Sequence, residues 1–424
     1  MGIPSVLDTV TSDWQHRLAL NVEMMRDTSR QTDPQALVQA YAARMRRLVP
    51  IDRMIWLSRR ELDPPKYRIT RNTLWQDDVN PWKEKERLPV LEGGLLGELI
   101  YGDEPRIIDD IEIDDDDPGK EYLTGQRSLI AIPNYDQGVA LNMNILLRAE
   151  PFAFSREQFP ELVSVGNLFG RTTHYLVLSE QLRDEMKTIG EIQRSLLPAR
   201  FPSIPGMDLA AHYQTSRSAG GDYYDFFPLP DGKWGILIAD VSGHGAPAAV
   251  IMAVTHSIFH SYPEPRVSPA RVLEYVNRHL AMRYTADSGT FVTAFYCVYD
   301  PVTRRLTYGN AGHNPPRVKH CPGSKVTELS EARRPPLGVA MDERFEESMY
   351  SMQPGDQFVL YTDGITEARN RAGRMFGLER LDCAIRGCRE NAADLIGAVI
   401  AAVEAFADGR PADDDRTLLV AKVM

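Results

Sequence analysis

Two short acidic motifs between residues 219 and 245 constrain the fold of this chain more than any other feature. The first, GGDYYD, spans residues 220–225, and the second, ADVSGHG, spans residues 239–245. A turn signal and an apolar run lie between them, which predicts a hairpin with a buried strand. This hairpin would bring Asp222 and Asp240 together at one end of a sheet. Carboxylate oxygens suit a hard divalent cation, and the neighbouring glycines would let backbone carbonyls approach it.

Two more aspartates follow the same pattern further along the chain. Asp363 ends the apolar run 358–362, and Asp414 precedes the apolar run 417–421. Together the aspartates would form an all-oxygen site for two divalent ions, Mn²⁺ or Mg²⁺ by ligand hardness. Two such ions would deprotonate a water molecule and neutralise charge on a phosphoryl group during in-line attack. We therefore predict a phosphate-ester hydrolase in which Asp222, Asp240 and Asp363 act in catalysis and no side chain is the nucleophile.

Length and composition limit the remaining possibilities. A chain of 424 residues is long enough for two domains, or for three. Its net charge of −11 argues against a nucleic-acid-binding protein. We find neither a signal peptide nor an apolar run of about 20 residues, so we expect a cytoplasmic protein without a membrane span. The cysteines show neither metal-binding spacing nor a disulfide framework, and we interpret them as separate core residues: Cys297, Cys321, Cys383 and Cys388.

The N-terminal part of the chain predicts a small α+β domain over residues 15–171. Its element order and the segments SLIAIP at 128–133 and Phe154-Ser155, where we expect a helix to begin, resemble a GAF domain. That resemblance implies a sensor that receives a small-molecule or protein signal, although no residue set selects one ligand. The expected elements are helices at 7–30, 34–48 and 91–100, and strands at 53–59, 67–71, 127–133 and 138–147.

A helical linker is predicted over residues 172–198. Apolar side chains recur there at steps of three and four, between charged residues, over about three heptads. This spacing favours a short parallel coiled coil and hence a homodimer, while a helix packed on its own domain is the alternative. Pro198 would end the helix and begin a third segment, 199–424. The apolar positions are Tyr175, Leu178, Leu182, Met186, Ile189, Ile192 and Leu196.

The motifs of this third segment resemble one enzyme family. GGDYYDFF, ADVSGHG, NAGHNPP, YTDGITE and DDRTLLV, in this order, are similar to the metal-dependent PPM serine/threonine phosphatases, in particular the stage II sporulation protein E-like group. The resemblance implies a four-layer αββα sandwich with metal ions at one end of its two sheets. It implies metal ligation by Asp222, Asp240, Asp363 and Asp414, with Asp240 bridging, and by the carbonyl of Val241, where family members often carry glycine. Asp415 could replace Asp414.

The same resemblance implies a substrate and a pathway. The substrate would be a phosphoserine or phosphothreonine on a STAS-domain anti-anti-sigma protein, in a bacterial partner-switching pathway regulated by the sensor domain. The alternative is a catalytically weak, phosphatase-like binding or scaffold protein. A GGD motif also occurs in cyclic-dinucleotide cyclases, but the YTDGITE and DDRT motifs do not belong to them. Cys383 and Arg389 match the spacing of thiol phosphatases but lack the preceding histidine, so we interpret that match as coincidence.

Three further residues near the motifs could have either a functional or a structural role. His244 would act as a general acid or contact phosphate, or else hold the glycine turn. His313, between Gly312 and Asn314, is typical of a turn residue. Arg217 could bind substrate phosphate through two hydrogen bonds, and a surface arginine is the simpler interpretation.

Overall fold

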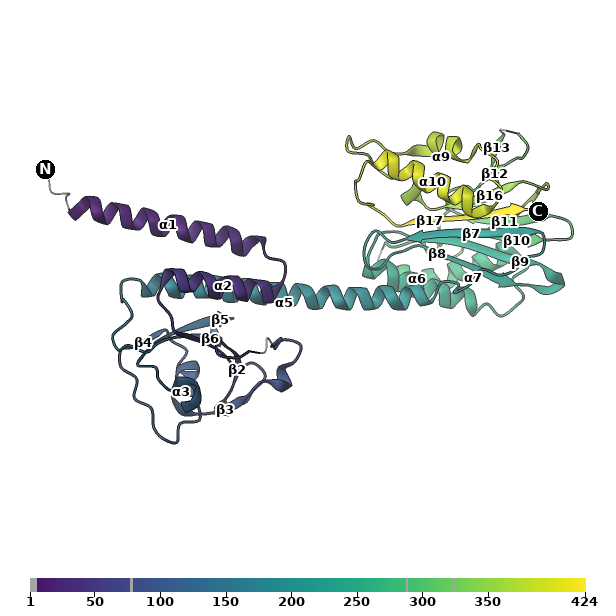
Figure 1. The fold of residues 1–424 in the computed structure, drawn as a ribbon. Coiled ribbons are helices and arrows are strands. Elements are labelled where there is room, and N and C mark those ends of the chain that lie inside the picture. Colours follow the sequence, from purple (N-terminus) through teal and green to yellow (C-terminus); the bar gives the residue numbers. More distant parts are fainter. Residues whose placement is uncertain (1–5, 77–78, 287–288, 324) are drawn as a thin grey trace. The chain divides into compact units, whose positions relative to one another are not determined.

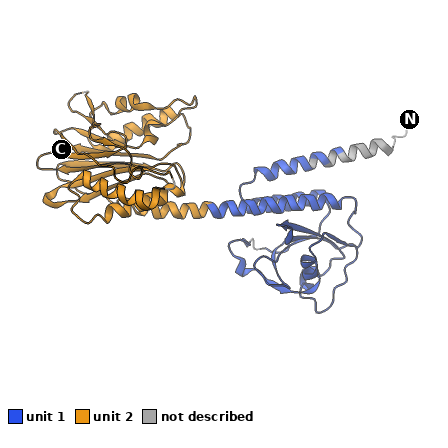
Figure 2. Ribbon diagram, turned by 180° about the vertical axis from the view of Figure 1, so that it is seen from behind, with its two compact units in different colours: residues 1–182 blue, residues 183–424 orange. Residues whose placement is uncertain are grey.

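The computed structural model describes residues 6–76, 79–286, 289–323 and 325–424, and the chain divides into two compact units. Figure 2 shows them as residues 1–182 and 183–424. Among the described residues, no helix is both long enough and apolar enough to cross a bilayer.

The first unit is built on an antiparallel sheet with the strand order β3-β2-β1-β6-β5-β4 (Figure 1). The β5–β6 hairpin turns at Gln137 and Gly138, close to the expected position. The strands are β1 Arg53–Ser58, β2 Lys66–Asn72, β3 Val90–Glu92, β4 Arg106–Ile108, β5 Ser128–Asp136 and β6 Val139–Arg148.

Alternating side chains of these strands pack on two sets of helices. Trp56 and Leu146 face helices α2 and α5, whose Tyr41 and Phe169 stack with ring centroids 3.9 Å apart. The neighbours of Trp56 and Leu146 along each strand face α3 and α4 instead. Helix α2 begins where the sequence predicts, because the Asp33 side chain accepts a hydrogen bond from the backbone N–H of Ala36 at 2.6 Å. The helices are α1 Val6–Arg30, α2 Pro34–Leu48, α3 Gly94–Gly102, α4 Lys120–Leu123 and α5 Phe159–Ser195, with the 3₁₀ turn η1 Lys85–Arg87.

Helix α5 is longer than the sequence analysis predicts. The expected helix start at Ser155 is wrong, because the chain becomes helical only at Phe159, and it then continues without a break to Ser195. Two glycines let its first half lie directly on strand β5. A Cβ atom at Gly166 would be 2.5 Å from the side chain of Ile132, and one at Gly170 would be 2.7 Å from that of Asn134.

The second unit contains two sheets that face each other. The first has the order β14-β11-β10-β9-β8, with β15 also paired to β11, and the second has the order β13-β12-β16-β17-β7. Phe295 of β10 and Phe358 of β16 meet between them, with ring centroids 6.1 Å apart. The strands are β7 Met207–Gln214, β8 Tyr223–Pro228, β9 Trp234–Val241, β10 Val292–Asp300, β11 Arg305–Ala311, β12 Arg317–Lys319, β13 Val326–Glu328, β14 Arg333–Arg334, β15 Ser348–Ser351, β16 Gln357–Tyr361 and β17 Arg416–Val423.

Helices cover the outer face of each sheet in this unit. Helices α6 and α7 pack on β9, β10 and β11, and α10 packs on β7 and β17 with α9 beside it (Figure 1). The predicted four-layer αββα sandwich is therefore confirmed. The helices are α6 Ala246–His260, α7 Pro269–Leu280, α8 Asp363–Thr366, α9 Gly377–Ile385 and α10 Ala392–Ala407, with the short turns η2 Pro230–Gly232 and η3 Ala281–Thr285.

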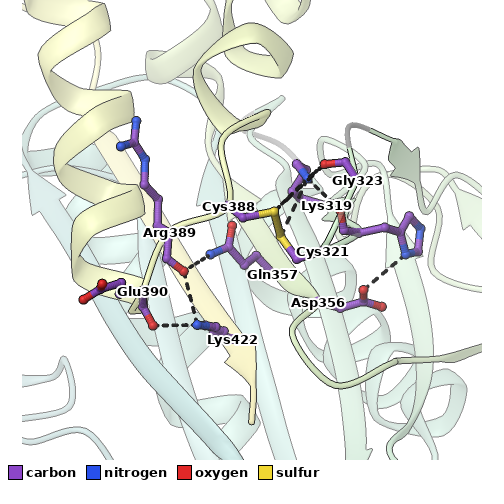
Figure 3. The surroundings of a disulfide bond; sticks show 10 residues. Lys319, Cys321, Gly323, Asp356, Gln357, Cys388, Arg389, Glu390 and Lys422 are labelled. Carbon is purple, nitrogen blue, oxygen red and sulfur yellow. Dashed lines mark hydrogen bonds and ion pairs between the residues drawn. A yellow bond between two sulfur atoms is a disulfide. The ribbon is translucent and has the colours of Figure 1, made fainter.

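Two of the cysteines form a disulfide, which corrects the sequence analysis. Cys321 and Cys388 are bonded across 67 residues of sequence (Figure 3). Cys388 lies after the end of α9, in the loop before α10, whereas Cys383 is an exposed residue of α9. The buried ammonium of Lys319 lies 3.4 Å from the Cys388 sulfur and donates to the carbonyl of His320 at 2.6 Å. The interpretation of separate core residues holds only for the buried Cys297.

Candidate metal centre

The predicted aspartates all lie at the ends of strands in the second unit. Asp222 directly precedes β8, and Asp240 is near the end of β9. These two strands pair as the predicted hairpin, with Tyr223 opposite Ala239. Asp363 follows β16 as the first residue of α8, and Asp414 precedes β17. The four carboxylates come together, since the charges of the other three each raise the pKa of Asp240.

Asp222 is held by hydroxyl groups from the second sheet. It is 1% exposed, and one of its carboxylate oxygens accepts hydrogen bonds from the hydroxyls of Thr362 at 2.8 Å and Thr417 at 2.6 Å. Thr362 Oγ1 also accepts from the backbone N–H of Thr417 at 3.0 Å, so the three residues form one network. The sequence analysis missed both threonines, although each lies inside a quoted motif, YTDGITE and DDRTLLV. This network links Asp222, which directly precedes a strand of the first sheet, to threonines at the ends of two strands of the second sheet.

Burial, and then the crowding of negative charge, raises the pKa values of these carboxyl groups. Burial and the nearby charges of Asp415 and Asp363 together raise the pKa of Asp222 to about 8, although the hydrogen bonds from the two threonines oppose them. Burial and the charge of Asp414 raise the pKa of Asp363 to about 6. The pKa of Asp240 is raised well above its usual range, first by burial. A cation would relieve this repulsion, and a donor set made of carboxylates and carbonyls fits Mn²⁺ or Mg²⁺.

Close backbone approaches around the cluster require glycine. A Cβ atom at Gly221 would lie 2.8 Å from the carbonyl oxygen of Val241. One at Gly220 would lie 2.0 Å from a carboxylate oxygen of Asp415, and one at Gly364 would lie 1.9 Å from the carbonyl oxygen of Asp415. The GGD loop, residues 219–222, therefore packs directly on the end of β9, against the carbonyl of Val241.

The structure assigns different roles to the two neighbouring aspartates before β17. Asp415 is 3% exposed, and its two carboxylate oxygens accept from the backbone N–H groups of Ser216 at 2.8 Å and Gly221 at 2.7 Å. It is thus engaged in holding the GGD loop. Asp414 is partly exposed and accepts from the backbone N–H of Asp415 at 2.8 Å. We therefore propose Asp414 as the metal ligand and Asp415 as a residue that positions the loop.

Gln193 is a residue of this site that the sequence analysis missed. It is 3% exposed near the end of α5, and its amide makes two hydrogen bonds to the backbone of Gly220. The side-chain nitrogen donates to the carbonyl at 2.6 Å, and the backbone N–H donates to the side-chain oxygen at 2.9 Å. At Gly190, one turn earlier, a Cβ atom would lie 1.8 Å from the carbonyl oxygen of Ser218. The end of α5 is therefore a direct support of the GGD loop.

The two histidines occupy different environments. His313 is 1% exposed, its Nδ1 lies 2.8 Å from the hydroxyl of Thr293, and that hydroxyl lies 3.4 Å from the backbone oxygen of Asp240. Burial lowers the pKa of His313 to about 3, so it is neutral and supports the site structurally. His244 is exposed in the glycine turn before α6, near enough for its charge to lower the pKa of Asp414. Arg217 is exposed.

Comparisons with known proteins converge on this unit. The family model of stage II sporulation protein E matches residues 230–424. The phosphoserine phosphatase RsbU of Bacillus subtilis is 30% identical over 196 residues, which are 46% of this chain and 57% of RsbU. The phosphoserine phosphatase RsbP of the same organism is 31% identical over 163 residues, 38% of this chain and 40% of RsbP. The chain thus spans about half the length of these curated relatives.

A solved structure agrees on the fold. The SiaA-PP2C domain of Pseudomonas aeruginosa aligns with a TM-score of 0.52 and 22% identity, over 58% of this chain and 98% of that domain. At this identity the match shows a shared PP2C-like fold.

Proposed function

Because residues 230–424 match the family model of stage II sporulation protein E, we propose that the chain is a metal-dependent phosphoserine/phosphothreonine protein phosphatase. One observation carries the proposal. Four carboxylates from separate strand ends converge around Asp240, and burial and mutual repulsion raise their pKa values. A folded protein keeps such a cluster at a cost in stability, which a bound cation offsets.

Each residue of the cluster has a definite task in this proposal. Asp240 would bridge two ions, Asp222, Asp363 and Asp414 would complete their carboxylate ligands, and the Val241 carbonyl would add a neutral oxygen. When bound, Mn²⁺ or Mg²⁺ supplies a nucleophilic water at neutral pH and neutralises charge on the phosphoryl group. The chain supplies geometry: the threonine hydroxyls hold Asp222, and Asp415 and Gln193 hold the loop that carries it.

Phosphate release from a phosphoserine peptide tests the function directly. We expect the purified full chain to release phosphate in the presence of Mn²⁺, and we expect excess chelator to stop the reaction reversibly. A chain that binds Mn²⁺ but releases no phosphate, from the peptide or from an intact phosphoprotein, would support the phosphatase-like scaffold instead.

The finer substrate proposal is a phosphorylated STAS-domain protein. It rests on the family resemblance and on relatives that are named phosphoserine phosphatases. A folded phosphorylated STAS domain should then be dephosphorylated faster than a peptide that carries the same phosphoserine. Equal rates would mean that the enzyme recognises only the phosphorylated segment.

A cavity in the first unit supports the proposal of a sensor. It measures about 120 Å³ and lies on the face of the sheet that α2 and α5 cover. Several buried polar atoms of its lining have no hydrogen-bond partner among the residues that the structure describes: Nε1 of Trp56, Oδ1 of Asn134 and Oγ1 of Thr173. Unpaired buried donors and acceptors are costly, so we propose that a small uncharged molecule with several hydrogen-bonding groups binds there.

Replacing Thr173 with valine tests whether the unpaired polar lining destabilises the ligand-free protein. We expect Thr173→Val to raise the thermal midpoint of the ligand-free chain, by about 1 kcal/mol in free energy of unfolding, because it removes an unpaired buried hydroxyl. Thr285→Val is the matched control, because Thr285 is also buried but donates a hydrogen bond to the Gly338 carbonyl at 2.8 Å. That variant should lose about 1–3 kcal/mol. Equal losses in both variants would show that the Thr173 hydroxyl is satisfied.

The exposed apolar side chains of α5 support the proposal of a homodimer. Tyr175, Leu178 and Leu182 are 68%, 46% and 51% exposed, at spacings of three and four residues. We propose that this stripe packs against the same stripe of a second copy. Sedimentation equilibrium should give a dimer for the full chain and a monomer for Leu182→Glu, while Arg183→Glu, on the adjacent exposed position, should remain dimeric. A monomeric wild-type chain would contradict the proposal.

Regulation would follow from the continuity of α5. Phe169 and Thr173 of the helix line the cavity, and near the end of the helix Gln193 donates a hydrogen bond to the Gly220 carbonyl of the GGD loop. We propose that ligand binding or dimer packing shifts the helix and thereby changes how often Gln193 holds the loop in place.

A further inference from the structure

A second group of potential metal ligands lies on the outer side of the β8–β9 hairpin. Asp225 projects from β8, and His256 and His260 project from α6. The carboxylate and the imidazoles each offer one ligand atom, and these atoms all lie within 4.8 Å of one another. None of these residues takes part in the aspartate cluster described above.

Local structure explains how the three side chains meet. Residues four apart lie on the same face of an α-helix, so His256 and His260 stack with ring centroids 4.2 Å apart. Tyr223 and Phe227, on either side of Asp225 in β8, contact these rings at centroid distances of 5.5 Å for Tyr223–His256 and 5.2 Å for Phe227–His260. The register of α6 over β8 therefore places both imidazoles against Asp225.

Hydrogen bonds within the protein already fix the orientation of the Asp225 carboxylate. Asp225 is 7% exposed, the Tyr223 hydroxyl donates to its Oδ2, and the backbone N–H of Phe226 donates to its Oδ1 at 2.8 Å. Such outer hydrogen bonds orient the ligands of structural and catalytic metal sites. Oδ2 also lies 2.7 Å from Nε2 of His260, whose side chain is 45% exposed. The cluster is thus buried on the carboxylate side and open to solvent on the other.

A simple His–Asp pair accounts for only two of the three residues. Within the described part of the chain, neither ring nitrogen of His256 has a hydrogen-bond partner. This half-buried imidazole nonetheless turns toward the pair that Asp225 and His260 form. Two imidazoles and a carboxylate are a donor set typical of Zn²⁺, with water in the remaining position, and it differs from the all-oxygen set around Asp240.

We propose that Asp225, His256 and His260 form a zinc-type metal site, separate from the phosphatase centre. The ion would join β8 to α6. Strand β8 begins directly after Asp222, and α6 begins directly after the glycine turn that follows Asp240. Zinc bound here would therefore stabilise the two elements that follow Asp222 and Asp240 along the chain.

Equilibrium dialysis of the full chain against Zn²⁺, with millimolar Mg²⁺ present to occupy the oxygen-ligand site, tests the proposal. We expect a bound zinc ion whose affinity falls at least about 10–100-fold in His256→Ala and in His260→Ala, as the loss of a site residue predicts. His279→Ala is the matched control, since His279 is also a helical histidine but its Nδ1 is engaged by the Tyr275 carbonyl at 2.8 Å. The control should bind zinc as the wild type does.

Two further measurements distinguish loss of the zinc site from loss of folding. Circular dichroism of each variant shows that it is folded, and Zn²⁺ should raise the thermal midpoint of the wild type and of His279→Ala but not of His256→Ala. Zinc binding that is equal in the wild type and in both site variants, or absent from the wild type under these conditions, would overturn the proposal. Because the readouts are binding and stability, they do not depend on phosphatase activity.

Discussion

Replacing Asp240 with asparagine should abolish most of the Mn²⁺-dependent hydrolysis and, at the same time, stabilise the metal-free chain. Asp240 is the proposed bridging ligand, so we expect the rate to fall by about 10²–10³-fold or more, the range that loss of one preorganised electrostatic group causes. The gain in stability follows from the repulsion at this position, because burial and the charges of Asp222, Asp363 and Asp414 all oppose ionisation of Asp240. Asparagine keeps the shape and removes that charge.

The same repulsion predicts the pH dependence of the metal-free protein. The pKa of Asp222 is raised to about 8 and that of Asp363 to about 6, both above their values in the unfolded chain. The folded state therefore binds these protons more tightly. Their contribution to stability is complete below about pH 4 and is lost as the pH rises through 6 and 8. Stabilisation by added Mn²⁺ should be largest at the alkaline end of this range.

Thermal unfolding with and without Mn²⁺, together with phosphate release, measures both effects. Asp231→Asn is the matched control, because Asp231 is an exposed turn residue of the same hairpin whose φ of 60° asparagine tolerates. The control should change neither activity nor stability. If Asp240→Asn kept its activity, or if it destabilised the metal-free chain, Asp240 would not be the centre of a cation site.

Replacing Gln193 with alanine should cost both stability and activity, although this residue contacts no substrate in our proposal. The change leaves the buried N–H and carbonyl of Gly220 without partners, at about 1–3 kcal/mol for each group. Asp222 lies two residues further along the same loop. A displacement of about 1 Å in a reacting group can cost about 10²-fold in rate. We therefore expect weaker Mn²⁺ binding and slower phosphate release.

The dependence on Mn²⁺ concentration distinguishes positioning from simple loss of folding. A positioning role predicts that high Mn²⁺ recovers part of the activity of Gln193→Ala at a temperature where the variant is folded. Glu191→Ala, an exposed change two residues away on α5, should behave as the wild type. Normal Mn²⁺ affinity in folded Gln193→Ala would show that α5 does not control the metal centre, and the proposed regulation through this helix would then lack its physical link.

Short-range patterns determined the parts of this protein that the sequence analysis predicts correctly. The hairpin that joins Asp222 to Asp240 follows from one apolar run and one turn, and the start of α2 follows from the Asp33 cap. Such signals act within a few residues and survive in the sequence alone. The αββα sandwich is predicted in a different way, as what the resemblance of the ordered motifs to the PPM phosphatases implies.

Tertiary structure decided what depends on pairing over long distances in the chain. The distinction between Asp414 and Asp415 rests on hydrogen bonds from Ser216 and Gly221, which are 199 and 194 residues away from Asp415. The partner of Cys321 is 67 residues distant, and the meeting of Asp225 with His260 depends on how α6 lies on β8. No local propensity encodes these contacts, because each arises only when packing of the core brings separate elements into register.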